Sequence, residues 1–207
     1  MKECKKLPQF MGGWYIDKKL TDQLIETFHA KNDLHRPGTL GKNIEDNKKK
    51  KSTDIGVSPY ILKSPFRDYV ESVLACVQMY YKKYKFADIG VAVNGIFTNY
   101  NIQWYKPGEG YFAEHFERTG KWHYERVLVF MTYLNTVEDG GGTHFRFQNL
   151  TQQAKKGLTL LWPTDFTHIH NGIVSPTEHK YIATGWFNFQ DGITNYFRGR
   201  EDEKNNV

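Results

Sequence analysis

Residues 126–147 read RVLVFMTYLNTVEDGGGTHFRF, and this stretch decides the fold. It opens on a run rich in apolar and β-branched residues, Arg126–Leu134, which is typical of a strand. Glycines at positions 140, 141 and 142 then interrupt the chain, and a second strand-like run, Thr143–Phe147, follows them. Two strands separated by a glycine-rich turn indicate antiparallel β structure.

Similar short runs lie on both sides of this stretch. Runs at 98–105 and 110–117 precede it, and runs at 158–162, 167–170 and 181–189 follow it. Glycine or proline residues separate several of these runs, as at Pro107-Gly108 and Trp162-Pro163. Several short strands with such punctuation predict a β-sandwich or barrel between about residues 95 and 190.

The N-terminal part carries two helical patterns instead. The first covers residues 17–30, where Asp17 is a good N-cap and apolar residues recur at helical spacing. The second begins with Ser64 as the expected N-cap and Pro65 at the first helical position, and it ends near residues 84–85. These patterns predict an α+β, mainly β fold in which two helices pack on the β core.

Length and composition set limits on the class of protein. The 207 residues predict a single domain, residues 1–207, with a helical part at about 1–90 and a β core at about 95–190. No apolar run approaches the roughly 18 residues of a membrane span, and no apolar segment of a signal peptide follows Met1. With only Cys4 and Cys76 a disulfide framework is excluded, so we expect a cytoplasmic protein with no membrane partner.

The net charge of +5 has a local source, the lysine run at 48–51. A solvated loop explains this run better than a phosphate-binding patch. The run lies within residues 31–58, a polar stretch without periodicity that predicts a functional or a disordered loop and is the candidate lid. Trp104, Trp122 and Tyr124 are candidate aromatic residues for the pocket or its rim.

Histidines concentrate in the predicted β region, where six of the eight follow residue 114. His115 and Glu117 stand two residues apart, so on a strand both side chains point to one face. A further histidine at 168 or 170 would complete two imidazoles and one carboxylate, the ligand set of non-haem Fe(II) oxygenases. The pair alone is a weak signal, because His123 and Glu125 repeat its spacing and a surface ion pair would look the same.

Four segments together resemble the 2-oxoglutarate/Fe(II) dioxygenases of the prolyl 4-hydroxylase type. In chain order they are YKPGEGY at 105–111 with HFE at 115–117, RVLVFMTYLN at 126–135, GGGTHF at 140–145, and GLTLLWP at 157–163 with His170, Lys180-Tyr181 and Gly185-Trp186. The resemblance covers about residues 98–190. It implies a double-stranded β-helix core of the jelly-roll or cupin type, with the N-terminal helices packed on one sheet.

The distal histidine requires a choice. His168 and His170 would share a strand face, so spacing alone does not separate them. In the resembling family a basic residue follows the distal histidine by about ten positions, the spacing between His170 and Lys180 here. The resemblance thus implies His115, Glu117 and His170 as metal-binding and catalytic residues, although the family usually has Asp at the position of Glu117.

The resemblance also implies a co-substrate site. It places Lys180, Tyr133, Thr143 and Tyr105 around 2-oxoglutarate, with Trp186 as a wall of the pocket. A carboxylate buried in the barrel needs a paired cation, and Lys180 would supply it. The alternatives are a solvated strand lysine at 180 and ordinary core packing for the tyrosines and the tryptophan.

The implied activity is that of a 2-oxoglutarate- and Fe(II)-dependent dioxygenase. It would hydroxylate a peptidyl prolyl or related C–H group, with peptide or small-molecule substrates, and release succinate and CO2. Fe(II), 2-oxoglutarate and dioxygen are the implied cofactor and co-substrates, and ascorbate is a further candidate cofactor. Two alternatives stay open: a nucleic-acid-modifying dioxygenase, although nucleic acid is not the expected partner, and a metal-free jelly-roll binding module, which only Glu117 favours.

Overall fold

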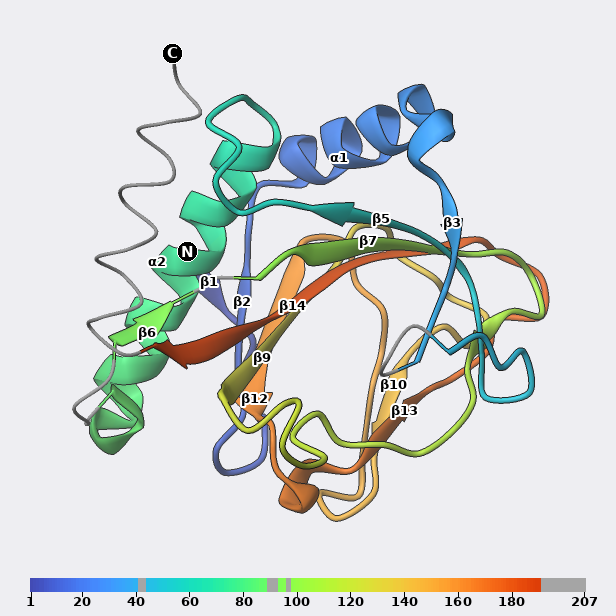
Figure 1. Cartoon of the computed structure of the whole chain (residues 1–207). Coiled ribbons are helices and arrows are strands. Elements are labelled where there is room, and N and C mark those ends of the chain that lie inside the picture. Colours follow the sequence, from blue (N-terminus) through green and yellow to red (C-terminus); the bar gives the residue numbers. More distant parts are fainter. Residues whose placement is uncertain (41–43, 89–92, 96–97, 191–207) are drawn as a thin grey trace.

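The computed structural model describes residues 1–40, 44–88, 93–95 and 98–190 (Figure 1). Its helices are α1 (Lys18–Ala30) and α2 (Phe66–Lys83), with short 3-10 helices η1 (Asn32–Leu34), η3 (Lys85–Asp88) and η4 (Phe166–His168). Its strands are β1 (Lys2–Glu3), β2 (Gly12–Tyr15), β3 (Arg36–Pro37), β4 (Lys50–Lys51), β5 (Thr53–Val57), β6 (Val93–Gly95), β7 (Tyr100–Tyr105), β8 (Gly110–Tyr111), β9 (Arg126–Tyr133), β10 (Thr143–Phe145), β11 (Leu150–Gln152), β12 (Leu158–Pro163), β13 (His170–Gly172) and β14 (Lys180–Gln190).

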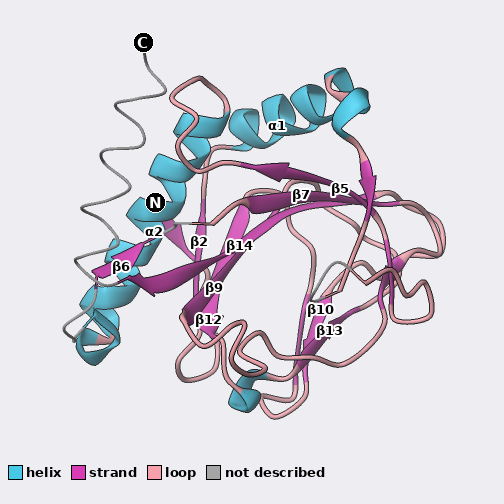
Figure 2. Cartoon of the chain, in the orientation of Figure 1, coloured by secondary structure: helices cyan, strands magenta, loops and turns pink. Residues whose placement is uncertain are grey.

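The strands form one large sheet, one small sheet and a two-stranded ribbon. The large sheet has the order β1-β2-β12-β9-β14-β7-β5-β3, and β6 also pairs with β14. The small sheet has the order β11-β10-β13, and β4 pairs with β8 in the ribbon. Every pairing between these strands is antiparallel. Figure 2 shows α1 and α2 on one side of the large sheet and the small sheet beyond the other side, so the α+β, mainly β prediction is confirmed.

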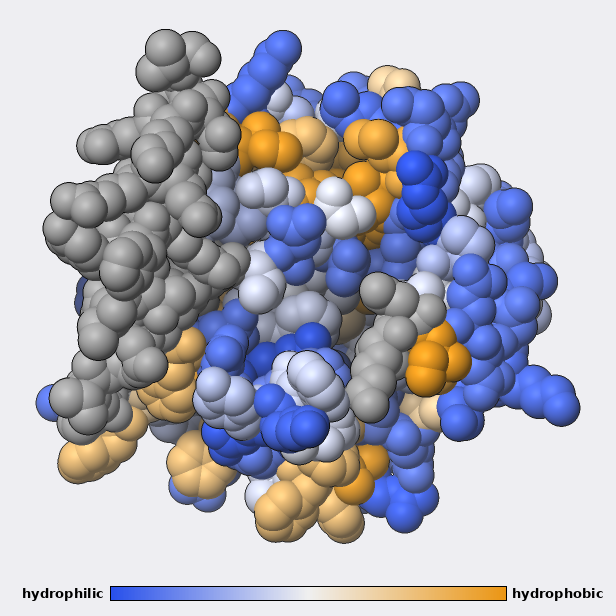
Figure 3. All heavy atoms as spheres, viewed as in Figure 1, coloured by the Kyte–Doolittle hydropathy of each residue, from blue (hydrophilic) through white to orange (hydrophobic). Residues whose placement is uncertain are grey.

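Strand β9 shows how one sheet serves two cores. Leu128 and Phe130 point toward the helices, whereas Val129, Met131 and Tyr133 point toward the small sheet. This alternation follows from the two-residue period of a strand. The first core therefore joins the helices to the large sheet, and the second fills the space between the two sheets. On the face seen in Figure 3, hydrophilic side chains predominate and the exposed apolar residues form separate patches.

The helices follow their predicted patterns with one correction. Asp17 caps α1 by accepting a hydrogen bond from the backbone N–H of Lys19, as expected. Ser64 does not cap α2: the cap residue is Pro65, and the Ser64 hydroxyl donates to Oδ2 of Asp68 instead. The helix consequently starts one residue later than predicted, at Phe66.

Three predicted segments differ from the structure. Residues 31–58 are not a continuous loop, because β5 pairs with β7 inside the large sheet and β3 pairs with β5. The strand predicted at 110–117 is regular only at Gly110–Tyr111. Residues 166–168 form η4 rather than a strand, since the backbone N–H of His168 bonds the carbonyl of Asp165 and closes a turn. The N-terminal part is thus only partly helical, because it contributes five strands among the described residues.

Candidate active site between the two sheets

A cavity of about 690 Å³ lies between the large and the small sheet. Met131 and Ile182 line it from the large sheet, and Thr143 and His170 line it from the small sheet. Lys50, from the ribbon, forms part of its wall. A concave space of this size is typical of a small-molecule site, and polar or charged side chains form much of its wall.

His115, Glu117 and His170 meet in this cavity. One ligand atom from each lies within 4.8 Å of the other two, and this is the only such cluster in the described part of the chain. Oε1 of Glu117 lies 3.5 Å from Nε2 of His115 and 3.5 Å from Nε2 of His170. Two imidazoles and one carboxylate on one side of a cavity can hold a divalent metal ion and leave other coordination positions open.

Backbone contacts orient both imidazole rings. The backbone N–H groups of His115 and His170 each donate to the other residue's carbonyl at 2.9 Å. These two bonds join the backbone at His115 to β13. Nδ1 of His115 lies 2.9 Å from the carbonyl of Ala113, and Nδ1 of His170 lies 2.9 Å from the carbonyl of His168. A proton on each Nδ1 would be donated to these carbonyls, which leaves the Nε2 lone pairs for a metal.

The protonation states of Glu117 and His170 favour metal binding. Burial and the neighbouring His115 lower the pKa of His170, so its neutral form is favoured. Burial raises the pKa of Glu117, but the close contacts of its carboxylate with His115 and His170 outweigh the effect of burial and hold that pKa well below its usual range. A neutral imidazole and an ionised carboxylate are the forms that ligate metals.

His168 lies near the cluster but does not join it. Its Nδ1 atom lies 3.0 Å from the Thr167 hydroxyl, and its backbone carbonyl contacts Nδ1 of His170. Burial lowers the pKa of His168 to about 4. Because η4 replaces the expected strand, His168 and His170 no longer share a face, and the structure places His170 beside Glu117.

Two side chains hold the outer oxygen of Glu117. Nε1 of Trp186 donates to Oε2 at 3.1 Å, and Nη1 of Arg126 approaches the same oxygen at 3.4 Å. Arg118, the neighbour in sequence that could have paired with Glu117, pairs with Asp165 instead, at 2.6 Å between Nη2 and Oδ2. Trp186 therefore contacts the carboxylate of the cluster rather than only walling the cavity.

Lys180 lies in the same cavity, with 7 % of its surface exposed. Its Nζ atom has one hydrogen bond, to the Gly142 carbonyl at 3.4 Å, and no acidic partner among the described residues. Burial lowers the pKa of Lys180 to about 8. The solvated-lysine alternative is thus wrong, and a buried cation in this setting is suited to a bound carboxylate.

The hydroxyl groups near Lys180 have defined partners. The Tyr133 hydroxyl donates to Oγ1 of Thr143 at 2.7 Å and also lies 3.3 Å from the carbonyl of Gln152. The Nζ atom of Lys180 lies 5.5 Å from the ring centre of Tyr105 and 5.7 Å from that of Tyr133. Of the predicted co-substrate residues, Lys180, Thr143, Tyr105 and Trp186 line the cavity, whereas Tyr133 lies behind Thr143.

Sequence reasoning missed a buried polar network beside Tyr105. The Tyr105 hydroxyl donates to Oε1 of Gln103 at 2.7 Å, and Nε2 of Gln103 donates to Oδ2 of Asp54 at 3.0 Å. The same carboxylate accepts hydrogen bonds from Lys50 at 2.8 Å and Ser52 at 2.7 Å. The prediction of a solvated lysine run is therefore wrong for Lys50. The alternation of polar residues at 50, 52 and 54 was the available signal, because it places all three on one face of an extended chain.

The remaining candidates lie outside the cluster. His123 lines the cavity but its Nδ1 contacts the Thr119 hydroxyl, and Glu125 is exposed.

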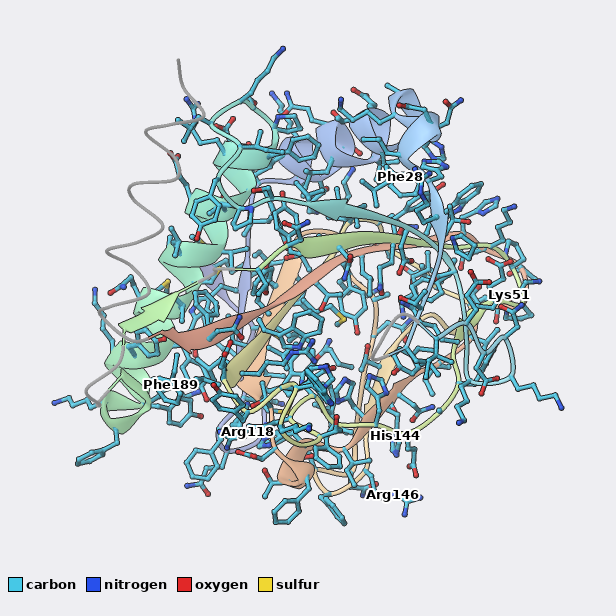
Figure 4. All side chains as sticks on the ribbon, in the orientation of Figure 1. Phe28, Lys51, Arg118, His144, Arg146 and Phe189 are labelled. Atoms are coloured by element: carbon cyan, nitrogen blue, oxygen red, sulfur yellow. The ribbon has the colours of Figure 1, made fainter. Side chains whose placement is uncertain are left out.

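Trp104 lies on the outer face of the large sheet, stacked on Tyr181, so its prediction as a pocket residue is wrong. Other histidines bond elsewhere, as His144 does with Thr151 in the small sheet (Figure 4). Trp122 and Tyr124 are 65 % and 64 % exposed and do not line the cavity.

No helix in the described ranges combines the length and the apolar character that crossing a membrane requires.

Comparison with known proteins supports the chemistry of this cavity. Residues 100–188 match the family model of the 2OG-Fe(II) oxygenase superfamily. A search of curated proteins by sequence gives no match.

Solved structures show the same fold. A viral collagen prolyl hydroxylase from Paramecium bursaria Chlorella virus-1, in complex with 2-oxoglutarate, has a TM-score of 0.64 at 17 % identity, over 86 % of this chain and 96 % of that one. A prolyl 4-hydroxylase from Pseudomonas putida has a TM-score of 0.64 at 14 % identity, over 87 % and 93 %. A prolyl hydroxylase from Trichoplax adhaerens, in complex with a hypoxia-inducible-factor peptide fragment, has a TM-score of 0.67 at 14 % identity, over 86 % and 83 %.

The donor set of the cluster and the buried Lys180 both fit the requirements of the matched family. Residues 100–188 of the chain therefore form a region that matches the 2OG-Fe(II) oxygenase superfamily, whose enzymes use ferrous iron and 2-oxoglutarate.

Proposed function

We propose that this chain hydroxylates a C–H bond of a peptidyl prolyl residue, with 2-oxoglutarate as co-substrate. One observation carries the proposal: the His115–Glu117–His170 cluster and the buried Lys180 lie in one cavity between the sheets. The proposal that the substrate is a prolyl residue is supported by the similarity in fold to three prolyl hydroxylases. The products would be succinate, CO2 and the hydroxylated substrate, so that both atoms of dioxygen are accounted for.

His115, Glu117 and His170 would hold the ferrous ion. Iron bound together with 2-oxoglutarate supplies the dioxygen-dependent oxidation of the C–H bond. The orientation of both imidazoles by backbone carbonyls keeps their Nε2 atoms directed at one point. Three protein ligands on one side leave room for the co-substrate on the other side.

Lys180 and Thr143 would bind the far carboxylate of 2-oxoglutarate. The ammonium group of Lys180 would gain a counter-ion, and the Thr143 hydroxyl would donate a hydrogen bond. Tyr133 would act through Thr143, because its own hydroxyl proton is directed at Oγ1 of that residue. Apolar side chains along the cavity, including Trp162 and Ile182, would exclude water from the reacting groups.

The direct test measures succinate formed from 2-oxoglutarate with Fe(II), ascorbate and a panel of proline-containing peptides. Mass spectrometry should find one added oxygen atom on a proline of a turned-over peptide, and matched peptides with alanine in place of proline should stay unmodified. His115→Ala and His170→Ala should abolish succinate formation, whereas His123→Ala should retain it. A purified chain that binds neither Fe(II) nor 2-oxoglutarate would contradict the proposal and favour the metal-free binding module.

A further inference from the structure

The two carboxylate oxygens of Glu117 face different surroundings. Oε1 lies toward the imidazoles, 3.5 Å from each Nε2 atom. Oε2 accepts a hydrogen bond from Nε1 of Trp186 at 3.1 Å and contacts Nη1 of Arg126 at 3.4 Å. One oxygen is thus directed at the metal position, while protein donors occupy the other.

Arg126 and Trp186 support one another as well as Glu117. The guanidinium carbon of Arg126 lies 3.5 Å from the ring centre of Trp186, which is a close cation–π contact. Nη1 of Arg126 also donates to the backbone carbonyl of Glu117 at 3.1 Å. The two residues belong to β9 and β14, which are hydrogen-bonded neighbours in the large sheet. The two donors are therefore held by a rigid element and not by a loop.

A glutamate at this position needs such support more than an aspartate would. Its side chain has one more rotatable bond, so its carboxylate can turn more freely. A carboxylate that turned toward the metal could ligate through both oxygens and take a second coordination position. Two imidazoles and a one-oxygen carboxylate would leave open positions on the metal for 2-oxoglutarate and dioxygen. A glutamate that ligated through both oxygens would occupy one of these positions.

We propose that Arg126 and Trp186 are positioning residues that hold Oε2 of Glu117 and so restrict this carboxylate to one-oxygen ligation of the metal. The inference rests on the proposed function, because it takes His115, Glu117 and His170 as the metal ligands. It accounts for the glutamate in this chain: the extra methylene brings the carboxylate within reach of both the metal position and the two donors.

The experiment is an anaerobic titration of the full chain with Co(II), followed by affinity and by the visible absorption of the bound ion. Arg126→Met and Trp186→Phe should weaken Co(II) binding by about 10- to 100-fold and change the absorption spectrum, since loss of a partner of a ligand has effects of that size. Trp186→Phe removes the N–H donor and keeps a smaller aromatic ring beside Arg126. Arg118→Met is the matched control, because Arg118 pairs with Asp165 and does not contact Glu117, and it should leave affinity and spectrum unchanged.

The same substitution made in a Glu117→Asp variant distinguishes positioning of the Glu117 carboxylate from general damage to the fold. In Glu117→Asp the shorter side chain withdraws the carboxylate from the two donors, so adding Arg126→Met should change Co(II) affinity by less than about twofold. An equal loss from Arg126→Met in the wild type and in the Glu117→Asp background would overturn the inference, as would wild-type affinity and spectrum in both single variants. A wild-type chain that binds no Co(II) would overturn the proposed function and this inference with it, whereas wild-type binding with unaffected variants overturns the inference alone.

Discussion

The Nζ atom of Lys50, a residue that lines the cavity, lies 2.8 Å from Oδ2 of Asp54. Only 4 % of the Lys50 side chain and 12 % of the Asp54 side chain are exposed, so neither charge is well hydrated. Two residues from the polar N-terminal stretch thus form a buried ion pair beside the residues of the β core. Removal of one partner would leave the other charge buried without compensation.

Lys50→Met should therefore destabilise the chain by about 3–5 kcal/mol in urea unfolding. The matched control is Lys51→Met. Lys51 lies next to it at the edge of the molecule (Figure 4), with its side chain 56 % exposed and 3.4 Å from Glu109, and this change should cost about 0–1 kcal/mol. The double variant Lys50→Met/Asp54→Asn should recover part of the loss. Equal effects of the two lysine substitutions would contradict the buried ion pair.

Binding of 2-oxoglutarate should weaken as the pH rises through 8. Burial lowers the pKa of Lys180 to about 8, so the ammonium form that attracts a carboxylate is present below this pH and is lost above it. The dissociation constant of 2-oxoglutarate with the Co(II)-loaded chain should increase about tenfold per pH unit above 8. Lys180→Arg is the control, because a guanidinium stays charged throughout, and any binding it supports should be independent of pH in this range. A flat profile for the wild type would refute the role of the ammonium group.

Replacement of Lys180 should stabilise the protein in the absence of 2-oxoglutarate. The pKa of Lys180 falls from 10.5 to about 8 on folding, so the folded state binds this proton more weakly than the unfolded state does. The free-energy cost of burying the charged ammonium group is present in full below pH 8. This cost disappears as the pH rises to 10.5, where the unfolded state also loses the proton. At pH 7 Lys180→Met should raise the free energy of unfolding by about 1–3 kcal/mol while abolishing 2-oxoglutarate binding. Lower stability of this variant would show that the ammonium group has a partner in the folded chain.

Substitution of His168 and substitution of His170 should have different effects on Fe(II) affinity. His170→Ala removes a side chain of the cluster and should lower Fe(II) affinity by at least about 100-fold in an anaerobic competition with a chelator. His168→Asn should keep the affinity within a few-fold, because the His168 ring faces Thr167 and only its backbone carbonyl contacts His170. The reverse order of effects would assign the ligand to His168.

The helices and most strands of the β core could be predicted because their signals are local. Asp17 and the apolar stripe of residues 17–30 specify α1, and the period of a strand explains why Val129 and Phe130 pack into different cores. The strand predicted for residues 110–117 failed for a physical reason. After Tyr111 the backbone bonds Lys49, His170 and Thr164 in turn instead of one partner strand, and no short-range pattern encodes these distant carbonyls.

The sequence by itself determined the α+β architecture and the residue types available for metal and carboxylate chemistry, because periodicity, turns and donor atoms are properties of neighbouring residues. Only the tertiary structure decided which groups meet: His170 rather than His168, Arg126 rather than Arg118 beside Glu117, and Lys50 buried against Asp54. Such pairings depend on how strands distant in sequence are aligned and where an irregular turn such as η4 replaces a strand. A shift of one residue in either would turn a different side chain toward the cavity.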